Sequence, residues 1–70
     1  MTTRQGLIRQ RLTLGLTQTA LARRAGVSTT TVFHVENGSL PRAINIPPLA
    51  TAYDMTPHAF VDELFKEMEK

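Results

Sequence analysis

LTQTALARRAGVSTTTVFHVENG, residues 16–38, is the stretch that decides how this chain folds. It contains two short predicted helices, at about residues 18–25 and 29–37, which are separated by a tight turn at Gly26. The second predicted helix is polar on its outer side. Two helices joined in this way predict a helix-turn-helix over about residues 17–37, an arrangement that can place its second helix in the major groove of DNA.

Each predicted helix has its own start and stop signals. Thr17 and Ser28 can cap the two helices, because their hydroxyl groups can accept a hydrogen bond from a backbone N–H of the first turn. Gly26 suits the left-handed backbone conformation in which a helix often ends, so it is expected to end the first helix, and Asn37-Gly38 is expected to end the second. The residues expected to face the core are Leu21, Ala22, Ala25, Val27, Val32 and Val35.

Three consecutive threonines, Thr29, Thr30 and Thr31, open the second predicted helix. β-Branched residues are poor helix formers, so stability alone would favour other side chains here. One interpretation is that the first turn tolerates them at little cost. The other is that their hydroxyl and methyl groups face base edges, where Thr can hydrogen-bond or touch a thymine methyl.

The length and composition of the chain limit what it can build. Seventy residues with 41% hydrophobic content predict one small domain over residues 1–70. There is no cysteine, so neither a disulfide nor a thiolate metal site is available. No apolar run has membrane-spanning length, and the N-terminal residues lack the apolar segment of a signal peptide, so we expect a cytoplasmic protein without membrane contact.

Charge is unevenly distributed along the chain, although the net charge is only +2. Residues 1–45 carry six arginines and one glutamate, a net of +5, whereas residues 46–70 carry two lysines and five acids, a net of −3. The basic part suits contact with phosphates, and the acidic part would stay away from them. The alternative is that both parts are ordinary solvated surfaces.

Three further helices are predicted outside the helix-turn-helix, which gives an all-α fold of five helices. Their bounds are about residues 4–14, 46–53 and 57–67, with caps expected from Thr2 or Thr3, Asn45 and Thr56. Pro47 and Pro48 cannot lie inside a helix, but the first turn accommodates them.

An arginine lies on the inward face of the first predicted helix, between Leu7 and Leu14. Arg11 needs a partner if it is buried, and Glu36 is the only acid among the first 45 residues. We therefore predict an Arg11–Glu36 ion pair, with solvent exposure of Arg11 as the alternative.

The apolar stripe of the fifth predicted helix is wider than one small core needs. Phe60 and Leu64 are expected to close the core, whereas Val61, Phe65 and Met68 form a candidate dimer or partner surface. The alternative is that all five side chains belong to the core.

Together these residues resemble the XRE family, the lambda-repressor-like and Cro-type helix-turn-helix proteins of phages and bacteria. The resemblance covers about residues 4–64 and rests on RLTLGLTQTALARRAG, VSTTTVFHVENG and LATAYDMTPHAF. It departs from the family at Pro47-Pro48, where an uninterrupted helix is usual. The resemblance implies a compact five-helix DNA-binding domain and a sequence-specific transcription regulator. It further implies a repressor that binds a pseudo-palindromic operator in double-stranded DNA as a homodimer.

The resemblance also implies roles for individual residues. Gln18 would contact a phosphate and reach a base, Thr29 and Thr30 would be the principal base readers, and Arg42 would clamp a phosphate in the loop after the second helix. His34 would be a third reader or a phosphate contact. The remaining expected DNA-binding residues are Thr17, Ser28 and Asn37, as phosphate or capping contacts, together with Thr31 and Phe33, whose ring could touch thymine methyls or pack on Leu40.

The sequence also bears on other classes of function. A nucleophilic serine motif and metal-ligand spacing are missing, and His34 and His58 lie on different predicted helices with no acid placed to orient either, so we expect no enzyme, cofactor or metal. One alternative is an antitoxin or interaction module that binds a protein partner, such as a toxin or effector, through the fifth helix. Another is an adaptor that has lost DNA binding.

Overall fold

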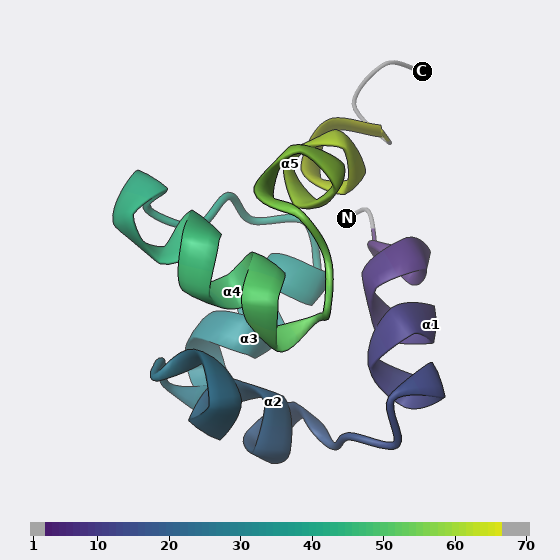
Figure 1. Ribbon diagram of the computed structural model, residues 1–70, viewed down its shortest axis with the longest axis vertical. Coiled ribbons are helices and arrows are strands. Elements are labelled where there is room, and N and C mark those ends of the chain that lie inside the picture. Colours follow the sequence, from purple (N-terminus) through teal and green to yellow (C-terminus); the bar gives the residue numbers. More distant parts are fainter. Residues whose placement is uncertain (1–2, 67–70) are drawn as a thin grey trace.

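The structure, a computed structural model, describes residues 3–66, and helices are the only regular secondary structure in that range (Figure 1). The elements in chain order are α1 (Gln5–Thr13), α2 (Gln18–Ala25), α3 (Thr29–Glu36), a short 3₁₀ helix η1 (Ala43–Asn45), α4 (Ile46–Ala52) and α5 (Pro57–Lys66). The predicted all-α class with five α-helices is therefore confirmed. In the view of Figure 1, α4 lies above and in front of α3, α2 lies below them, α1 lies to the right, and α5 is at the opposite end from α2.

One apolar core joins all five α-helices. The rings of Tyr53 and Phe60 lie 5.7 Å apart between their centroids and link the end of α4 to α5. Val27 and Leu14 were expected to face inward but are only half-buried, and Val27 packs against the core from the turn between α2 and α3. The buried apolar side chains are Leu7, Leu21, Ala22, Ala25, Val32, Val35, Leu49, Ala50, Ala52, Tyr53, Phe60 and Leu64.

Three predicted caps are present. The hydroxyl groups of Thr17, Ser28 and Thr56 each accept a hydrogen bond of 3.1 Å from a backbone N–H three residues further on. Gly26 ends α2 in the left-handed conformation, with φ of 73°, which glycine adopts without steric cost. These local signals fix where α2 ends and α3 begins, and so the angle at which α3 leaves the turn.

Two predicted caps are wrong. Asn45 makes no side-chain capping bond, because η1 runs directly into α4 and leaves Asn45 with φ of −89° and ψ of −8°, whereas a cap needs extended backbone. Helix α1 begins after Arg4 without a side-chain cap, so Thr3 does not cap it, and Thr2 lies outside the described residues. The predicted end of the fifth helix at Glu67 also lies outside them.

Candidate nucleic-acid interface

The outer face of α3 carries hydroxyl groups, one imidazole and one phenyl ring, with no Lys, Arg, Asp or Glu among them. Val32, Val35 and Glu36 are buried on the inner side, and the helical period of 3.6 residues places Thr30 and His34 opposite them. Thr29 and Phe33 are exposed beside that line, and Thr31 is half-buried on its other side. The only acid of α3 therefore faces inward, and its outer face carries nothing that repels phosphate.

The first turn of α2 lies beside the start of α3. The hydroxyl of Thr29 donates a long hydrogen bond of 3.5 Å to the hydroxyl of Thr19, and both side chains are exposed. Thr17 is also exposed in this region. Sequence reasoning missed Thr19, although its place two residues after the Thr17 cap puts it on the same first turn as Gln18.

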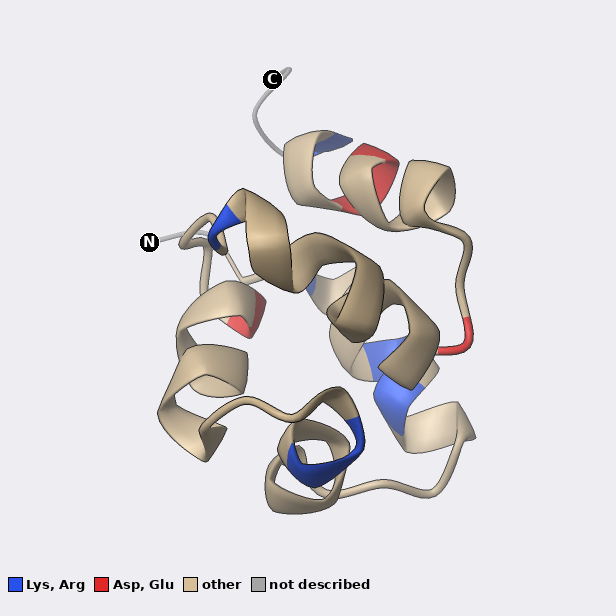
Figure 2. Ribbon diagram, turned by 60° about the vertical axis from the view of Figure 1, so that its left-hand side comes forward, with Lys and Arg blue, Asp and Glu red and all other residues tan. Residues whose placement is uncertain are grey.

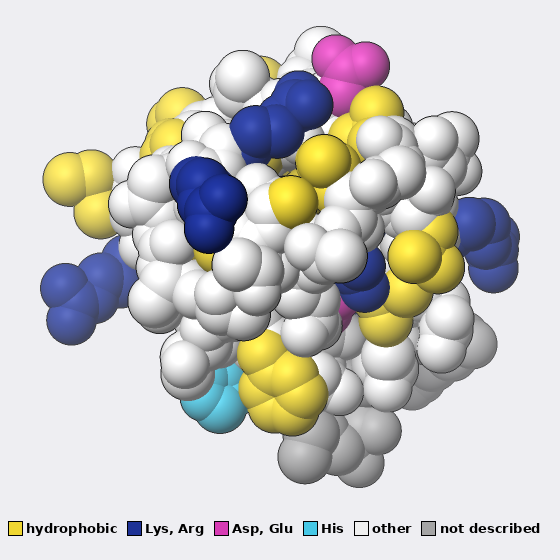
Figure 3. All heavy atoms as spheres, turned by 90° about the horizontal axis from the view of Figure 1, so that it is seen from below, with side chains coloured by type: hydrophobic (Ala, Val, Ile, Leu, Met, Phe, Trp, Pro, Cys, Tyr) yellow, Lys and Arg dark blue, Asp and Glu magenta, His cyan; other side chains and the backbone are white. Residues whose placement is uncertain are grey.

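The basic surface is smaller than the sequence suggested. Arg4 is only 3% exposed and Arg11 is paired with Glu36, so neither contributes a free positive charge to the surface. Four arginines remain exposed: Arg9, Arg23, Arg24 and Arg42. Figure 2 shows that α5 and the loop before it carry most acids of the described chain, and Figure 3 shows arginines spread among uncharged side chains on the α2 side.

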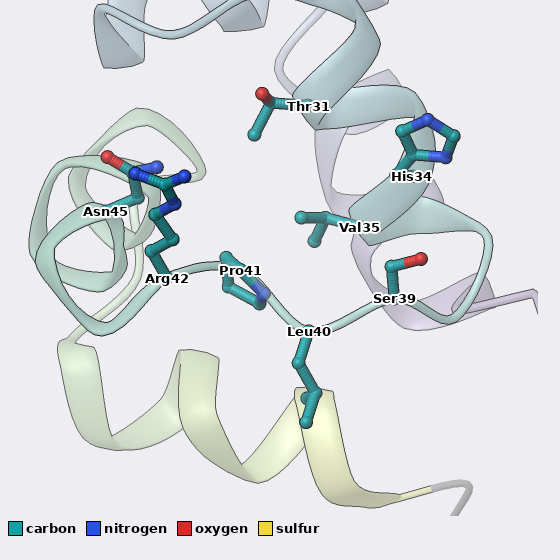
Figure 4. A pocket seen from close by; sticks show the side chains of 8 residues that line it. All are labelled: Thr31, His34, Val35, Ser39, Leu40, Pro41, Arg42 and Asn45. Atoms are coloured by element: carbon teal, nitrogen blue, oxygen red, sulfur yellow. The ribbon is translucent and has the colours of Figure 1, made fainter.

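A groove of about 400 Å³ runs between α3 and the segment that follows it (Figure 4). Thr31 and His34 lie on the α3 side, and Arg42 and Asn45 lie on the opposite side. The other lining residues are Val35, Ser39, Leu40 and Pro41. The groove thus brings together three of the expected DNA-binding residues, Thr31, His34 and Arg42, from two separate segments.

The ring of Phe33 lies edge-on to the ring of His34, with 5.6 Å between the ring centroids and an interplanar angle of 68°. This contact orients two neighbouring side chains on the outer face of α3. Phe33 remains half exposed, so an aromatic surface is available beside the polar groups. A thymine methyl is one apolar group that such a surface accepts in the major groove.

Glu36 is the centre of a buried polar cluster behind α3. Its carboxylate, 0% exposed, accepts hydrogen bonds from Arg11 Nε at 2.8 Å and Nη2 at 3.1 Å, which form the predicted ion pair. Tyr53 Oη donates at 2.7 Å and Gln18 Nε2 at 3.0 Å to the same carboxylate. These four bonds tie α1, α2 and the end of α4 to the last turn of α3.

Two expected phosphate contacts already use an amide N–H inside the protein. Gln18 is half-buried, and its Nε2 donates to Glu36. Asn37 Nδ2 donates to the backbone oxygen of Phe33 at 2.8 Å and so caps the end of α3. Of the two roles expected for Asn37, the structure thus contains the capping one.

The cluster makes the domain sensitive to acid. Burial alone raises the pKa of Glu36, but hydrogen bonds from Arg11, Tyr53 and Gln18 and the charge of Arg11 together lower the pKa below its ordinary value. A glutamate in an unfolded chain has a pKa of about 4.3. The stabilisation by Glu36 is therefore complete above about pH 4.3 and is lost as the pH falls through the lower folded pKa.

We expect Glu36→Gln to remove this part of the acid dependence, because the amide does not titrate. Melting temperatures measured from pH 6 to about pH 3 should fall more steeply for the parent than for the variant below about pH 4.3. Parallel curves over this range would show that Glu36 does not lower its pKa on folding.

The C-terminal helix departs from one prediction. His58 Nε2 lies 3.5 Å from Asp62 Oδ2, one helical turn further along α5, so an acid does stand beside this histidine. The spacing of four residues would have revealed it. Both side chains are largely exposed, at 90% and 69%, and within residues 3–66 no group of three potential metal ligands comes together.

The candidate partner surface is only partly described. Phe65 is 43% exposed and Val61 is half-buried, whereas Met68 lies outside the described residues. Phe60 and Leu64 are buried, as expected for the two that close the core. Three exposed apolar side chains were not anticipated as surface features: Leu12, Leu40 and Ile44.

Comparison with known proteins gives one match. A family model described as helix-turn-helix matches residues 7–60, which include α1 to α4 almost completely and the first turn of α5. Searches of curated proteins and of solved structures found no match. Among the described residues, no helix combines the length and the apolar character needed to span a membrane.

Proposed function

Since the chain belongs to the XRE-type helix-turn-helix family and is a DNA-binding transcription regulator, we propose that it is a sequence-specific repressor that binds as a homodimer to a pseudo-palindromic operator. The observation that carries the proposal is the outer face of α3, where exposed Thr29, Thr30, Phe33 and His34 stand without an acid among them. Such a face fits the major groove, where hydroxyl, imidazole and apolar groups meet base edges. We propose that it acts in the bacterial cytoplasm, whether a bacterial or a phage gene encodes it.

In the proposed complex, α3 lies in the major groove and reads bases through Thr29, Thr30 and His34. Phosphate contacts fix its register on the duplex without reading sequence. Arg42 supplies the charged contact across the groove of Figure 4, and the neutral ones come from Thr17, Gln18, Ser28, Thr31 and Asn37. Thr19 joins this group because of its contact with Thr29.

The proposed dimer uses the exposed side of α5. Phe65 and Val61 supply its apolar part, together with Met68, and a two-fold protein matches a two-fold operator. The same surface supports the second candidate function, an antitoxin or interaction module. In that case a protein partner, and not a second copy, covers Phe65.

Two substitutions separate base reading from phosphate contact. Thr30→Ala should change which base pair is preferred at one operator position, whereas Arg42→Ala should weaken binding to all duplexes alike. The second change should also reduce the slope of log K against log salt by about 1, because one phosphate contact is lost. Fluorescence anisotropy on a panel of duplexes that differ at single positions measures both effects. The proposal fails if both variants bind every duplex like the parent.

A further inference from the structure

Arg4 is a buried cation whose hydrogen bonds within the described chain all go to backbone oxygens. Nη1 donates to Val35 O at 2.5 Å and to Ser39 O at 2.7 Å. Nε and Nη2 donate to Leu64 O at 3.2 and 2.9 Å. Val35 and Leu64 lie near the C-terminal ends of α3 and α5, where carbonyl groups carry partial negative charge, so one guanidinium stabilises two helix ends.

The two acceptors of Nη1 both lie at the C-terminal end of α3, Val35 in its last turn and Ser39 three residues after it, and both line the groove in Figure 4. Val35 lines it from α3, and Ser39 lines it from the segment that follows. The backbone N–H of Arg4 also donates to Glu36 O at 2.8 Å, which adds a second bond to the end of α3. Arg4, together with the backbone bond of 2.9 Å from Ser39 N–H to His34 O, therefore fixes where the post-α3 segment leaves the recognition helix.

Only two residues separate Ser39 from Arg42. One of them is Pro41, whose ring fixes φ and so restricts the backbone conformations that this segment can adopt. Beyond it, Arg42 precedes η1, where Asn45 N–H donates to Arg42 O at 2.9 Å. The Arg42 backbone is thus held by η1 on one side and, through Ser39, by Arg4 on the other.

We propose that Arg4 is a positioning residue for DNA binding: from inside the fold it holds Arg42 at the distance from α3 at which both engage one duplex. This inference rests on the proposed function, in which Arg42 contacts a phosphate. Arg4 itself touches no DNA, since its side chain is buried.

A double-mutant cycle of Arg4→Met and Arg42→Ala tests the proposal. The probe is a fluorescent duplex of mixed sequence and about 20 base pairs, titrated at several salt concentrations and at a temperature where every variant is folded. In the parent, Arg42→Ala should weaken binding about tenfold at 0.1 M salt and lower the salt slope by about 1. In the Arg4→Met background the same change should cost about threefold or less, because Arg42 is already misplaced.

Two further variants keep the result interpretable. Arg4→Lys replaces Arg4→Met if the latter does not fold, since an ammonium keeps the charge but cannot span three carbonyl groups. Leu7→Val destabilises the same region of α1 through the core alone, and in its background Arg42→Ala should keep its full tenfold cost.

The outcomes distinguish the positioning role of Arg4 from the proposed phosphate contact of Arg42. If Arg42→Ala costs the same DNA affinity in the parent and in the Arg4→Met background, the positioning role is overturned and the phosphate contact stands. No loss from Arg42→Ala in the parent overturns the phosphate contact, and the positioning role falls with it. The proposal is supported if Arg42→Ala costs less affinity in the Arg4→Met (or Arg4→Lys) background than in the parent, and the full tenfold in the Leu7→Val background.

Discussion

Glu36→Ala is expected to destabilise the domain by about 3–5 kcal/mol, because it breaks a buried ion pair by removing one partner. Arg11 would keep its charge in a site where its side chain is only 11% exposed, and Tyr53 would lose the acceptor of its buried hydroxyl. A domain of this size has a total stability of only about 4–10 kcal/mol, so the variant should be largely unfolded well below the melting temperature of the parent. Urea unfolding followed by circular dichroism measures the difference.

A matched control is available on α5. Glu63 forms a pair with Lys66, with 3.2 Å between Oε1 and Nζ, and their side chains are 20% and 69% exposed, so Glu63→Ala removes a salt bridge that is much less buried than Arg11–Glu36. We expect a change within about 0.5 kcal/mol. If Glu36→Ala were as mild as Glu63→Ala, the cluster would not hold the helices together.

Thr30→Glu is expected to weaken DNA binding by about 100-fold or more while leaving the fold intact. In the proposed complex this carboxylate would enter the major groove between two lines of phosphates, and such like-charge contacts cost several kcal/mol. Thr30 is exposed and is the second residue of α3, where a negative charge stabilises the helix. Lost binding with an unchanged or higher melting temperature would therefore report the interface and not unfolding.

His58→Glu provides the corresponding control for charge. His58 is the second residue of α5, as Thr30 is of α3, and it lies outside the helix-turn-helix. The variant changes the charge of the chain by a similar amount at an equivalent helix position. Its affinity should stay within a few-fold of the parent, because steering by net charge is weak beside a direct contact. Equal losses in the two variants would exclude α3 as the DNA-facing element.

The sequence was sufficient where structure is decided locally. Caps at Thr17 and Ser28 and the left-handed Gly26 depend on residues within one helical turn, and each is present. The Arg11–Glu36 pair joins distant residues, yet elimination predicted it, because a buried arginine needed an acid and only one was within reach.

Arg4 was beyond sequence reasoning for a physical reason. Its partners are backbone carbonyls, which every residue has, so no residue type marks them. They come together only after α1, α3 and α5 have packed, at separations of up to 60 residues along the chain. Gln18 was similar, since a glutamine at the start of a helix gave no sign that its amide would join Glu36.

Selection of bound duplexes from a random DNA pool tests the central claim most directly. The purified protein would be used at about 0.15 M salt, where non-specific binding is weak. We predict enrichment of two inverted half-sites whose centres lie about 10 base pairs apart. Enrichment of a lone half-site would contradict the dimer, and a folded protein that enriched no sequence would contradict sequence-specific reading by α3.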